Sequence, residues 1–304
     1  MEINPHQLAE RIARLTPQKR EAFAAALAAQ GIALSRLPIV PSPDEGPRPL
    51  SWAQQRLWFL HRLDPDSSAY NMPAALRLRG TLDMDALQYS FDQLVARHGI
   101  LRSTFHEAEG KAHQVVHPQR PLVVARIDLS NEHGSDGTSR LQQLIDSETN
   151  RPFDLQQAAL RCLLVKLSDD EHVLVLTAQH IVADGWSLGV LVKELTAFYS
   201  AALQGVEAQL PALPVQYCDY ASWQQTCLSD SALAPELNYW RERLAGEQPF
   251  LELPTDHPRG KQSSGRGARH YLGVDPALTE GLRQLAKARG TTLFTVLLSA
   301  FNVL

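Results

Sequence analysis

The sequence has no excess of positive charge. Its 304 residues include 29 Lys or Arg and 33 Asp or Glu, which gives a formal net charge of −4. Proteins that bind nucleic acid usually present a strongly basic surface. The charge balance therefore argues against nucleic acid as the main partner.

Cysteines and long apolar runs are also scarce. The three cysteines, Cys162, Cys218 and Cys227, include no CxxC pair. This pattern is typical of reduced thiols in a cytoplasmic protein and argues against a zinc site. The longest apolar run, Leu293 to Leu304, contains polar residues and is too short to cross a bilayer. With no secretory signal pattern at the N-terminus, we predict a cytoplasmic protein that does not enter a membrane.

The chain does contain enough apolar material for two cores. Hydrophobic residues make up 44% of it and charged residues 20%, an ordinary balance for a globular protein. Proline-rich and loose segments divide it. We predict a helical N-terminal segment with a proline-rich linker over 1–46, a first unit over 47–228, and a second unit over 229–304. Because the sequence ends within an apolar helical pattern, we expect the second unit to be incomplete.

Helical and strand patterns alternate along the first unit, which indicates a mixed α/β (α+β) fold. Strands are predicted around residues 76–78 and over 101–105, 115–116, 122–127, 160–167, 173–178 and 268–274. Helices are predicted over 6–15, 17–29, 52–63, 83–95, 141–150, 188–199, 235–244, 276–289 and 293–304. The segments 160–167 and 173–178 are expected to form an antiparallel hairpin.

The most informative stretch runs from Val173 to Ser187. Its first four residues alternate Val and Leu, which predicts a strand buried on both faces. The break at Ala183-Asp184-Gly185 ends this pattern, and helical spacing follows it. A scaffold can present a catalytic group at such a strand end, and His180 lies there with Asp184 four residues on.

Two other chemistries are compatible with this stretch. At positions i and i+4, His180 and Asp184 could lie on one helix face and bind a metal ion. The sequence has no HExxH motif and no clustered third ligand, so we predict no metal site. Gly185–Gly189 fits GxSxG, the pattern of a serine hydrolase with Ser187 as nucleophile. Against it, His180 to Asp184 separate the serine from the strand, and Ser187 would more naturally cap the next helix. The other triad members would come from Asp219 or Asp256 and His257 or His270.

Aromatic residues stand in several of the helical patterns. They are Trp52, Trp58, Phe59, Trp223 and Trp240. Large aromatic side chains dominate protein cores. We therefore expect these residues to lie in the core rather than to contact a ligand.

Four segments resemble the first four core motifs of condensation domains of nonribosomal peptide synthetases. In chain order they are Leu50–Leu60 (LSWAQQRLWFL), Arg97–Phe105 (RHGILRSTF), Gln179–Ser187 (QHIVADGWS) and Tyr217–Trp223 (YCDYASW). The third resembles the HHxxxDG signature of that family. Four motifs in the right order are far more specific than any one of them alone.

This resemblance implies a fold similar to chloramphenicol acetyltransferase, doubled into two lobes, each a mixed sheet flanked by helices. The chain would hold the first lobe and the beginning of the second. It also implies amide formation between thioesters carried on the phosphopantetheine arms of upstream and downstream peptidyl carrier proteins, beside adjoining synthetase domains. No cofactor is expected to bind directly, and we expect a monomer that is inactive without the rest of the domain.

The resemblance also assigns residue roles. His180 matches the catalytic histidine of the signature, and Gly185 matches the glycine that keeps the channel beside it open. Asp184 matches an aspartate with a structural role, ion-paired to the arginine matched by Arg56. Gln179 replaces the first histidine of the signature, and this replacement favours one alternative, a condensation-like module that binds carriers without catalysis.

The second motif also departs from the family pattern. Gly99 stands where that motif usually has glutamate.

Overall fold

The computed structural model describes residues 4–303, apart from 17–18, 21, 24–25, 28–33, 43–45, 119, 133, 229, 248–253, 259–269 and 271. The chain forms two compact units, Met1–Pro254 and Thr255–Leu304. Helix α8 (Asp230–Arg243), which includes Pro235, belongs to the first of them. The division predicted from the sequence after residue 228 stays a prediction.

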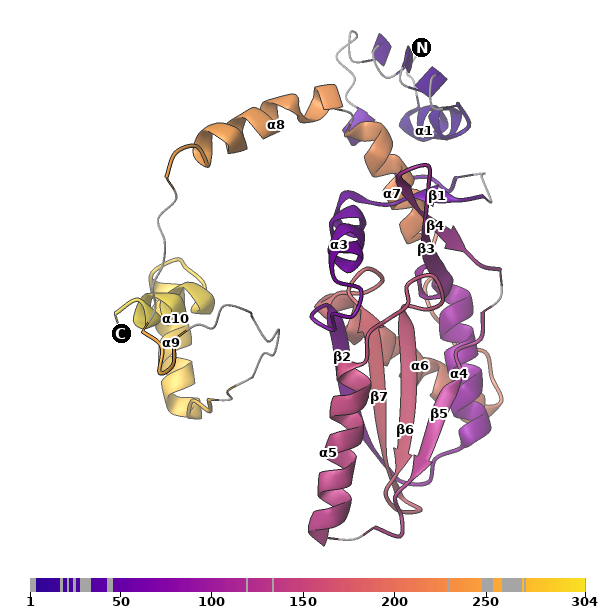
Figure 1. Cartoon of the computed structure of the whole chain (residues 1–304), viewed down its shortest axis with the longest axis vertical. Helices are drawn as coiled ribbons and strands as arrows, with labels where there is room; N and C mark the ends of the chain where they lie inside the picture. Colours follow the sequence, from indigo (N-terminus) through magenta and orange to yellow (C-terminus); the bar gives the residue numbers. More distant parts are fainter. Residues whose placement is uncertain are drawn as a thin grey trace. The chain divides into compact units, whose positions relative to one another are not determined.

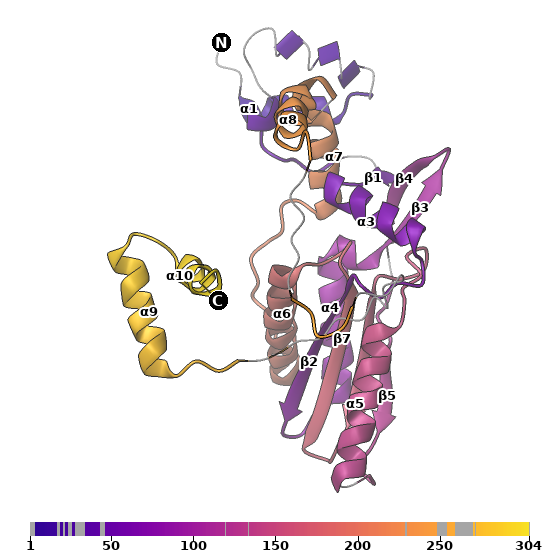
Figure 2. The same ribbon diagram turned by 60° about the vertical axis from the view of Figure 1, so that its left-hand side comes forward.

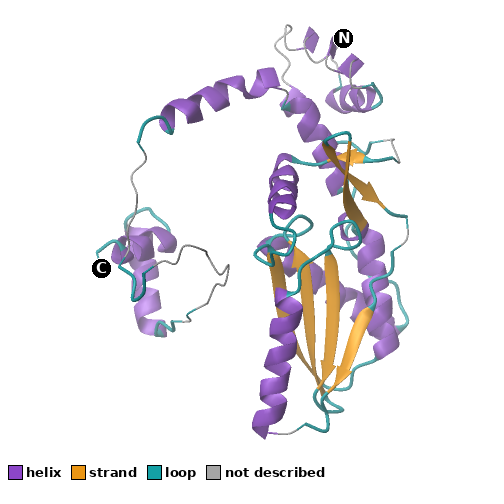
Figure 3. Ribbon diagram, in the orientation of Figure 1, coloured by secondary structure: helices purple, strands orange, loops and turns teal. Residues whose placement is uncertain are grey.

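A four-stranded mixed sheet lies at the centre of the first unit (Figures 1 and 3). Its order is β2 (Asn71–Arg79), β7 (Glu171–Gln179), β6 (Leu160–Lys166) and β5 (Val124–Asp128). β7 pairs antiparallel with both neighbours, and β5 pairs parallel with β6. The predicted hairpin of β6 and β7 and the mixed α/β fold are confirmed.

Three helices cover the two faces of this sheet: α4 (Met84–Arg97), α5 (Gly134–Asn150) and α6 (Gly185–Gln204). α4 and α6 pack against each other on one face, and α5 lies on the other (Figures 1 and 2). Each helix therefore needs one apolar stripe only, as in other layered folds.

Strand β7 is buried on both faces because its side chains alternate between two apolar clusters. Leu174 and Leu176 lie in the cluster that includes residues of α4 and α6. Val173 and Val175 lie in the cluster that includes Leu141 of α5. Successive side chains of a strand point to opposite faces, so the Val-Leu alternation divides its residues between the helix layers. The prediction made from this pattern is confirmed.

A smaller three-stranded sheet has the order β1 (Arg48–Pro49), β4 (Lys111–Val116) and β3 (Ser103–Ala108). β3 begins two residues later than predicted because a 3-10 helix, η2 (Gly99–Arg102), precedes it. Helix α3 (Trp52–Leu63) begins at the predicted N-cap. Its cap, Ser51, accepts a hydrogen bond from the backbone N of Gln54, whose side chain accepts one from the backbone N of Ser51, a capping box.

Most of the predicted core aromatics lie at the surface. Trp58 is buried, but Trp52 is 38% exposed, Phe59 64% and Trp240 54%. Helix α3 buries only one face, and residues 52 and 59, seven positions apart, lie together on the other. Trp223 is half-buried, and its indole Nε1 donates to the backbone O of Leu37 at 3.3 Å. The prediction was therefore wrong for three of the five residues.

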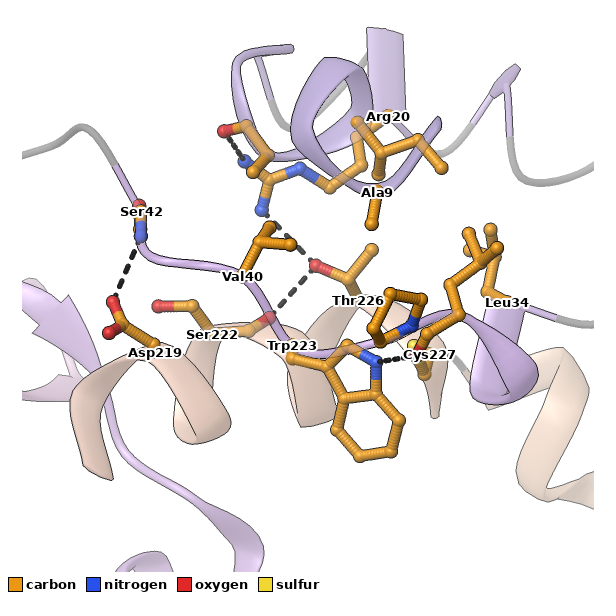
Figure 4. Close-up of a pocket in the computed structure, with 14 residues that line it drawn as sticks. Ala9, Arg20, Leu34, Val40, Ser42, Asp219, Ser222, Trp223, Thr226 and Cys227 are labelled. Atoms are coloured by element: carbon orange, nitrogen blue, oxygen red, sulfur yellow. Dashed lines mark hydrogen bonds between the residues drawn. The ribbon is translucent and has the colours of Figure 1, made fainter. Parts of the chain in front are cut away.

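The N-terminal segment packs against helix α7 (Tyr217–Cys227). Helix α1 (Pro5–Ala13) buries Leu8 and Ile12, as its pattern predicted, whereas much of the helix predicted over 17–29 lies outside the described residues. The Arg20 guanidinium donates to Thr226 Oγ1 on α7 at 3.1 Å and to the backbone O of Leu15 at 3.0 Å. A small cavity of about 50 Å³ lies at this contact (Figure 4).

The second unit contains two described helices, α9 (Pro276–Ala288) and α10 (Leu293–Phe301), as predicted. The strand predicted over 268–274 is absent from the part described there, residues 270 and 272–274. A strand is stabilised by hydrogen bonds to a neighbour. The described residues of this unit provide no such neighbour.

Candidate functional site

The side chain of Gln179, the last residue of strand β7, forms a hydrogen bond in the turn that follows the strand. This side chain is buried, and its Oε1 accepts a hydrogen bond from the backbone N of Ile181 at 2.5 Å. The backbone O of Gln179 accepts from the backbone N of Val182 at 3.0 Å. The glutamine thus accepts both hydrogen bonds of the turn that follows the strand, while its predicted structural role at an active site stays a prediction. An effect of this replacement on activity stays a hypothesis.

The turn places His180 at the surface of a cavity. The backbone N of His180 donates to the backbone O of Tyr70 at 2.9 Å, which holds the backbone against β2, while the side chain is exposed. The ring is part of the wall of a cavity of about 430 Å³, and no described residue forms a hydrogen bond with it. An imidazole in this position is open to a ligand. The assignment of His180 as the catalytic residue stays a prediction.

Asp184 caps helix α6. Its Oδ1 accepts hydrogen bonds from the backbone N of Ser187 at 2.7 Å and from the Ser187 hydroxyl at 2.6 Å. These two bonds lower the pKa of the carboxyl below its ordinary value, and the nearby His180 lowers it further. A carboxylate at a helix N-terminus also interacts favourably with the helix dipole.

The expected ion pair between Arg56 and Asp184 is not formed. Both residues border the cavity, but both are exposed, and no ion pair within 4.0 Å joins them. The carboxylate is already satisfied by the first turn of α6, and water can solvate both charges. The structural role predicted for Asp184 is therefore carried by a helix cap rather than by an arginine.

Replacing Asp184 by alanine is expected to lower the free energy of unfolding by about 0.5–2 kcal/mol, the usual effect of losing an N-cap. Asp184→Asn, which keeps a capping oxygen, should lose less. The folded carboxyl has a pKa below 3.8, so its stabilisation is present above that value and is lost as the pH falls through the lower folded pKa. Urea unfolding of both variants and the parent chain at pH 7 and pH 3 measures these effects. Equal losses for Ala and Asn would contradict the capping role.

Gly185 is the first residue of α6 and is exposed. A Cβ placed there would meet no atom within 4 Å. The described residues therefore leave open space beside the glycine, while the proposed need for that space stays a prediction.

The arrangement around Ser187 is that of a helix cap. Gly185–Gly189 lies within α6 rather than on a sharp turn between strand and helix, and the Ser187 hydroxyl donates to a carboxylate instead of to a base. Asp219, one of the suggested triad members, accepts from the backbone N of Ser42 and of Gln216. The other suggested members, Asp256, His257 and His270, belong to the second unit.

Asp219 joins the N-terminal segment to the site. The carboxylate is buried; its Oδ1 lies 3.0 Å from the backbone N of Ser42 (Figure 4), and its Oδ2 lies 2.9 Å from the backbone N of Gln216. Gln216 and its neighbour Tyr217 are part of the cavity wall. The fourth motif therefore contributes aromatic residues and also Asp219, a carboxylate that binds the backbone of two other segments.

Replacing Asp219 by alanine is expected to lower the free energy of unfolding by about 1–3 kcal/mol, because two N–H groups lose their acceptor. Asp169→Ala is the matched control, since the side chain of Asp169 is 98% exposed and a surface ion pair contributes little to stability. Urea unfolding followed by circular dichroism gives both values. If Asp219→Ala lost no more than the control, these hydrogen bonds would not be stabilising.

The residues of the cavity wall that sequence reasoning did not single out include His98 and Gln216. His98 belongs to the second motif, so a signal was present, but nothing in the sequence singled out Gln216. The described residues contain no group of three His, Cys, Asp or Glu that could hold a metal ion. Among the described helices, none has the length and apolar character needed to span a bilayer.

Comparisons with known proteins agree on one family. Residues 44–304 match the Condensation domain family. The chain is 42% identical over 289 residues to a linear gramicidin synthase protein of Brevibacillus parabrevis, covering 95% of this chain and 6% of that protein. It is 39% identical over 303 residues to phosphinothricin tripeptide synthetase PhsC of Streptomyces viridochromogenes, covering 98% of this chain and 28% of that protein. The chain thus spans a small part of these relatives.

Solved structures show the same fold. The X-domain in complex with OxyB from teicoplanin biosynthesis is 29% identical, with a TM-score of 0.69, covering 86% of this chain and 57% of that one. The first condensation domain of the CDA synthetase is 22% identical, with a TM-score of 0.66, covering 82% and 59%. Together with the four motifs and the mixed sheet, these matches show that the chain belongs to the Condensation domain family of nonribosomal peptide synthetases.

Proposed function

We propose that the intact domain containing this chain forms an amide bond between an upstream acyl or peptidyl thioester and the amine of a downstream aminoacyl thioester. The observation that carries this proposal is the exposed His180 ring in the wall of the 430 Å³ cavity, at the end of a strand buried on both faces. Two of its relatives are named as a synthase and a tripeptide synthetase. Their similarity to this chain supports peptide synthesis for the domain that contains it.

The nucleophile in this reaction needs little activation. An α-amine has a pKa of about 7.7–8.0, so near neutral pH a useful fraction is already the free base. Its nitrogen attacks the thioester carbon, and the resulting tetrahedral adduct carries an ammonium and an oxyanion. The adduct then collapses as the C–S bond breaks, leaving an amide and a thiolate.

In its neutral form, the imidazole of His180 orients the amine and accepts the proton that the ammonium must lose, and this proton ends on the departing thiolate. Such proton transfer by a positioned side chain contributes about 10²–10⁴-fold to a rate. The oxyanion is stabilised by His180 or by a backbone N–H near Gly185. Helix α6 begins at Gly185, and the N–H groups of a first helical turn can donate to an anion. Asp184 acts on the shape of this bend rather than on the reacting atoms.

The partners follow from the same reaction. Upstream and downstream peptidyl carrier proteins bring both thioesters on phosphopantetheine arms, and the domain itself binds no further cofactor. Adjoining synthetase domains are further partners. A cytoplasmic location is supported by the three cysteines, all of them free, and we expect the domain to act as a monomer.

An assay with two loaded carrier proteins tests the function. We expect the intact domain to give the amide product. Because the chain spans 59% of the solved condensation domain of the CDA synthetase, we expect residues 1–304 alone to give none. If the intact domain bound both carriers but formed no product, the alternative would hold, a module that binds carriers without catalysis. Labelling of Ser187 by a fluorophosphonate, abolished in Ser187→Ala, would instead favour the serine hydrolase.

A further inference from the structure

A second imidazole, His98, lies in the wall of the cavity that His180 borders. Its Nε2 is 2.6 Å from Oε2 of Glu194, a residue of helix α6 whose side chain is only 10% exposed. The guanidinium Nε of Arg97 is 3.2 Å from the same oxygen. The other ring nitrogen of His98, Nδ1, has no hydrogen-bond partner among the described residues. The site therefore contains a histidine whose Nε2 contacts a carboxylate and whose Nδ1 is bonded to no described residue.

The carboxylate determines which nitrogen of the ring carries the proton. Glu194 forms an ion pair with Arg97, and the carboxylate of an ion pair can only accept hydrogen bonds. Nε2 of His98 must therefore be the donor in the 2.6 Å contact. In the neutral ring, Nδ1 is then an acceptor with an available lone pair.

The side chain of Gln216 holds the backbone on both sides of His98. Its Oε1 accepts from the backbone N of Gly99 at 2.9 Å, and its Nε2 donates to the backbone O of Arg97 at 3.1 Å. A Cβ at position 99 would lie 3.3 Å from Gln216 Oε1. The glycine that replaces the usual glutamate of the second motif thus gives the amide room to approach. These two bonds hold the backbone that carries His98, and the contact with Glu194 holds its ring, before any ligand arrives. This lowers the entropic cost of binding.

We propose that His98 is a substrate-binding residue whose Nδ1 accepts a hydrogen bond from an N–H group of the ligand in this cavity. Glu194 and Gln216 are positioning residues that set its tautomer and place its backbone. The surrounding wall is largely aliphatic, including Ile100 and Leu101. An acceptor that loses water on ligand binding needs a new donor, since a buried unsatisfied group is costly. This inference rests on the proposed function, in which both the α-amine and the phosphopantetheine arm carry N–H groups.

The tautomer is tested first, because it does not depend on any activity. The 304-residue chain is labelled with 15N-histidine, and ring resonances are recorded at pH 8, above the ordinary histidine pKa of about 6.5. The His98 signals are assigned from their absence in His98→Asn. We expect His98 to carry its proton on Nε2. A proton on Nδ1 would overturn the proposal, because that nitrogen could then accept nothing.

Binding is tested with leucyl-pantetheine amide, which cannot undergo thioester chemistry, and with pantetheine alone. We expect the ligand to shift the His98 Nδ1 resonance and His98→Phe to weaken binding about 2- to 12-fold, as for loss of one hydrogen bond. His98→Asn, which keeps an acceptor near the Nδ1 position, should restore much of the affinity, and His113→Phe on β4 is the matched control. A shift with pantetheine alone would identify the arm as the donor, and a shift only with the leucyl compound would place the donor in its leucyl amide part, at the α-amine or at the amide N–H that replaces the thioester.

Two outcomes separate this inference from the proposed reaction. If the leucyl compound binds with the expected His98 shift while the intact domain forms no amide, the reaction is wrong and the binding role holds. If amide forms but folded His98→Phe binds both compounds as tightly as the parent chain, the binding role is wrong and the reaction holds. If His98→Phe does not fold, absence of any Nδ1 shift in the parent chain at saturating ligand overturns the proposal.

Discussion

Replacing His180 by alanine in the intact domain is expected to lower the rate of amide formation about 10²- to 10⁴-fold, the usual contribution of a positioned proton acceptor. The fold should be unaffected, because the side chain is exposed and makes no hydrogen bond to a described residue. Its backbone N–H, which bonds Tyr70, remains in the variant. The measurement is the rate of product formation from two loaded carrier proteins under single-turnover conditions.

His6→Ala is the matched control, since His6 is an exposed histidine on α1, in a part of the chain that does not border the cavity. Its rate should equal that of the parent domain. Carrier binding and the circular dichroism spectrum of His180→Ala should also be unchanged. A rate within a factor of about three of the parent would be far below the expected effect and would remove His180 from the mechanism.

Truncation of Phe91 to alanine is expected to lower the free energy of unfolding by about 3–5 kcal/mol, the usual range for a buried phenylalanine. Phe91 lies on α4, is 0% exposed, and belongs to the apolar cluster that contains Leu174 and Leu176 of β7. The cost combines lost apolar burial with the cavity that remains, because close-packed neighbours relax only partly. Single domains are stable by about 5–15 kcal/mol, so this change removes a large fraction of the total.

Tyr89→Ala is the control for Phe91→Ala, because Tyr89 lies on the same helix and is 47% exposed. Its effect on the free energy of unfolding should be no larger than about 0.5 kcal/mol in either direction, as is usual for surface substitutions. Urea unfolding of both variants gives the comparison. Loss of less than about 1 kcal/mol in Phe91→Ala would mean that the α4 layer does not support β7 as described, given the usual cost of such cavities.

Local patterns in the sequence determined the parts of the site that lie close together along the chain. The alternation of Val173 to Leu176 predicts a doubly buried strand, and the break at Asp184 predicts the helix that begins there. Ser51 predicts the start of α3. Each of these signals depends on neighbours within a few residues, so sequence alone contains it.

The motifs determined the family for a related reason. Four short segments of specific composition, in a specific order, identify a family more reliably than any one of them alone. They also directed attention to His180 and Asp184, which the structure places at one cavity. They did not predict the contacts of each matched residue, and the absent Arg56–Asp184 pair is the example.

Only the tertiary structure decided which distant side chains meet. Gln216 reaches the backbone at Arg97 and Gly99, more than a hundred positions away, and Glu194 of α6 meets His98. Whether Arg56 pairs with Asp184 or faces water depends equally on how α3 lies against α6. Such contacts depend on the relative placement of packed elements, and no local pattern encodes that placement. The sequence therefore determined the strand, the bend and the family, and the packing decided what lines the cavity.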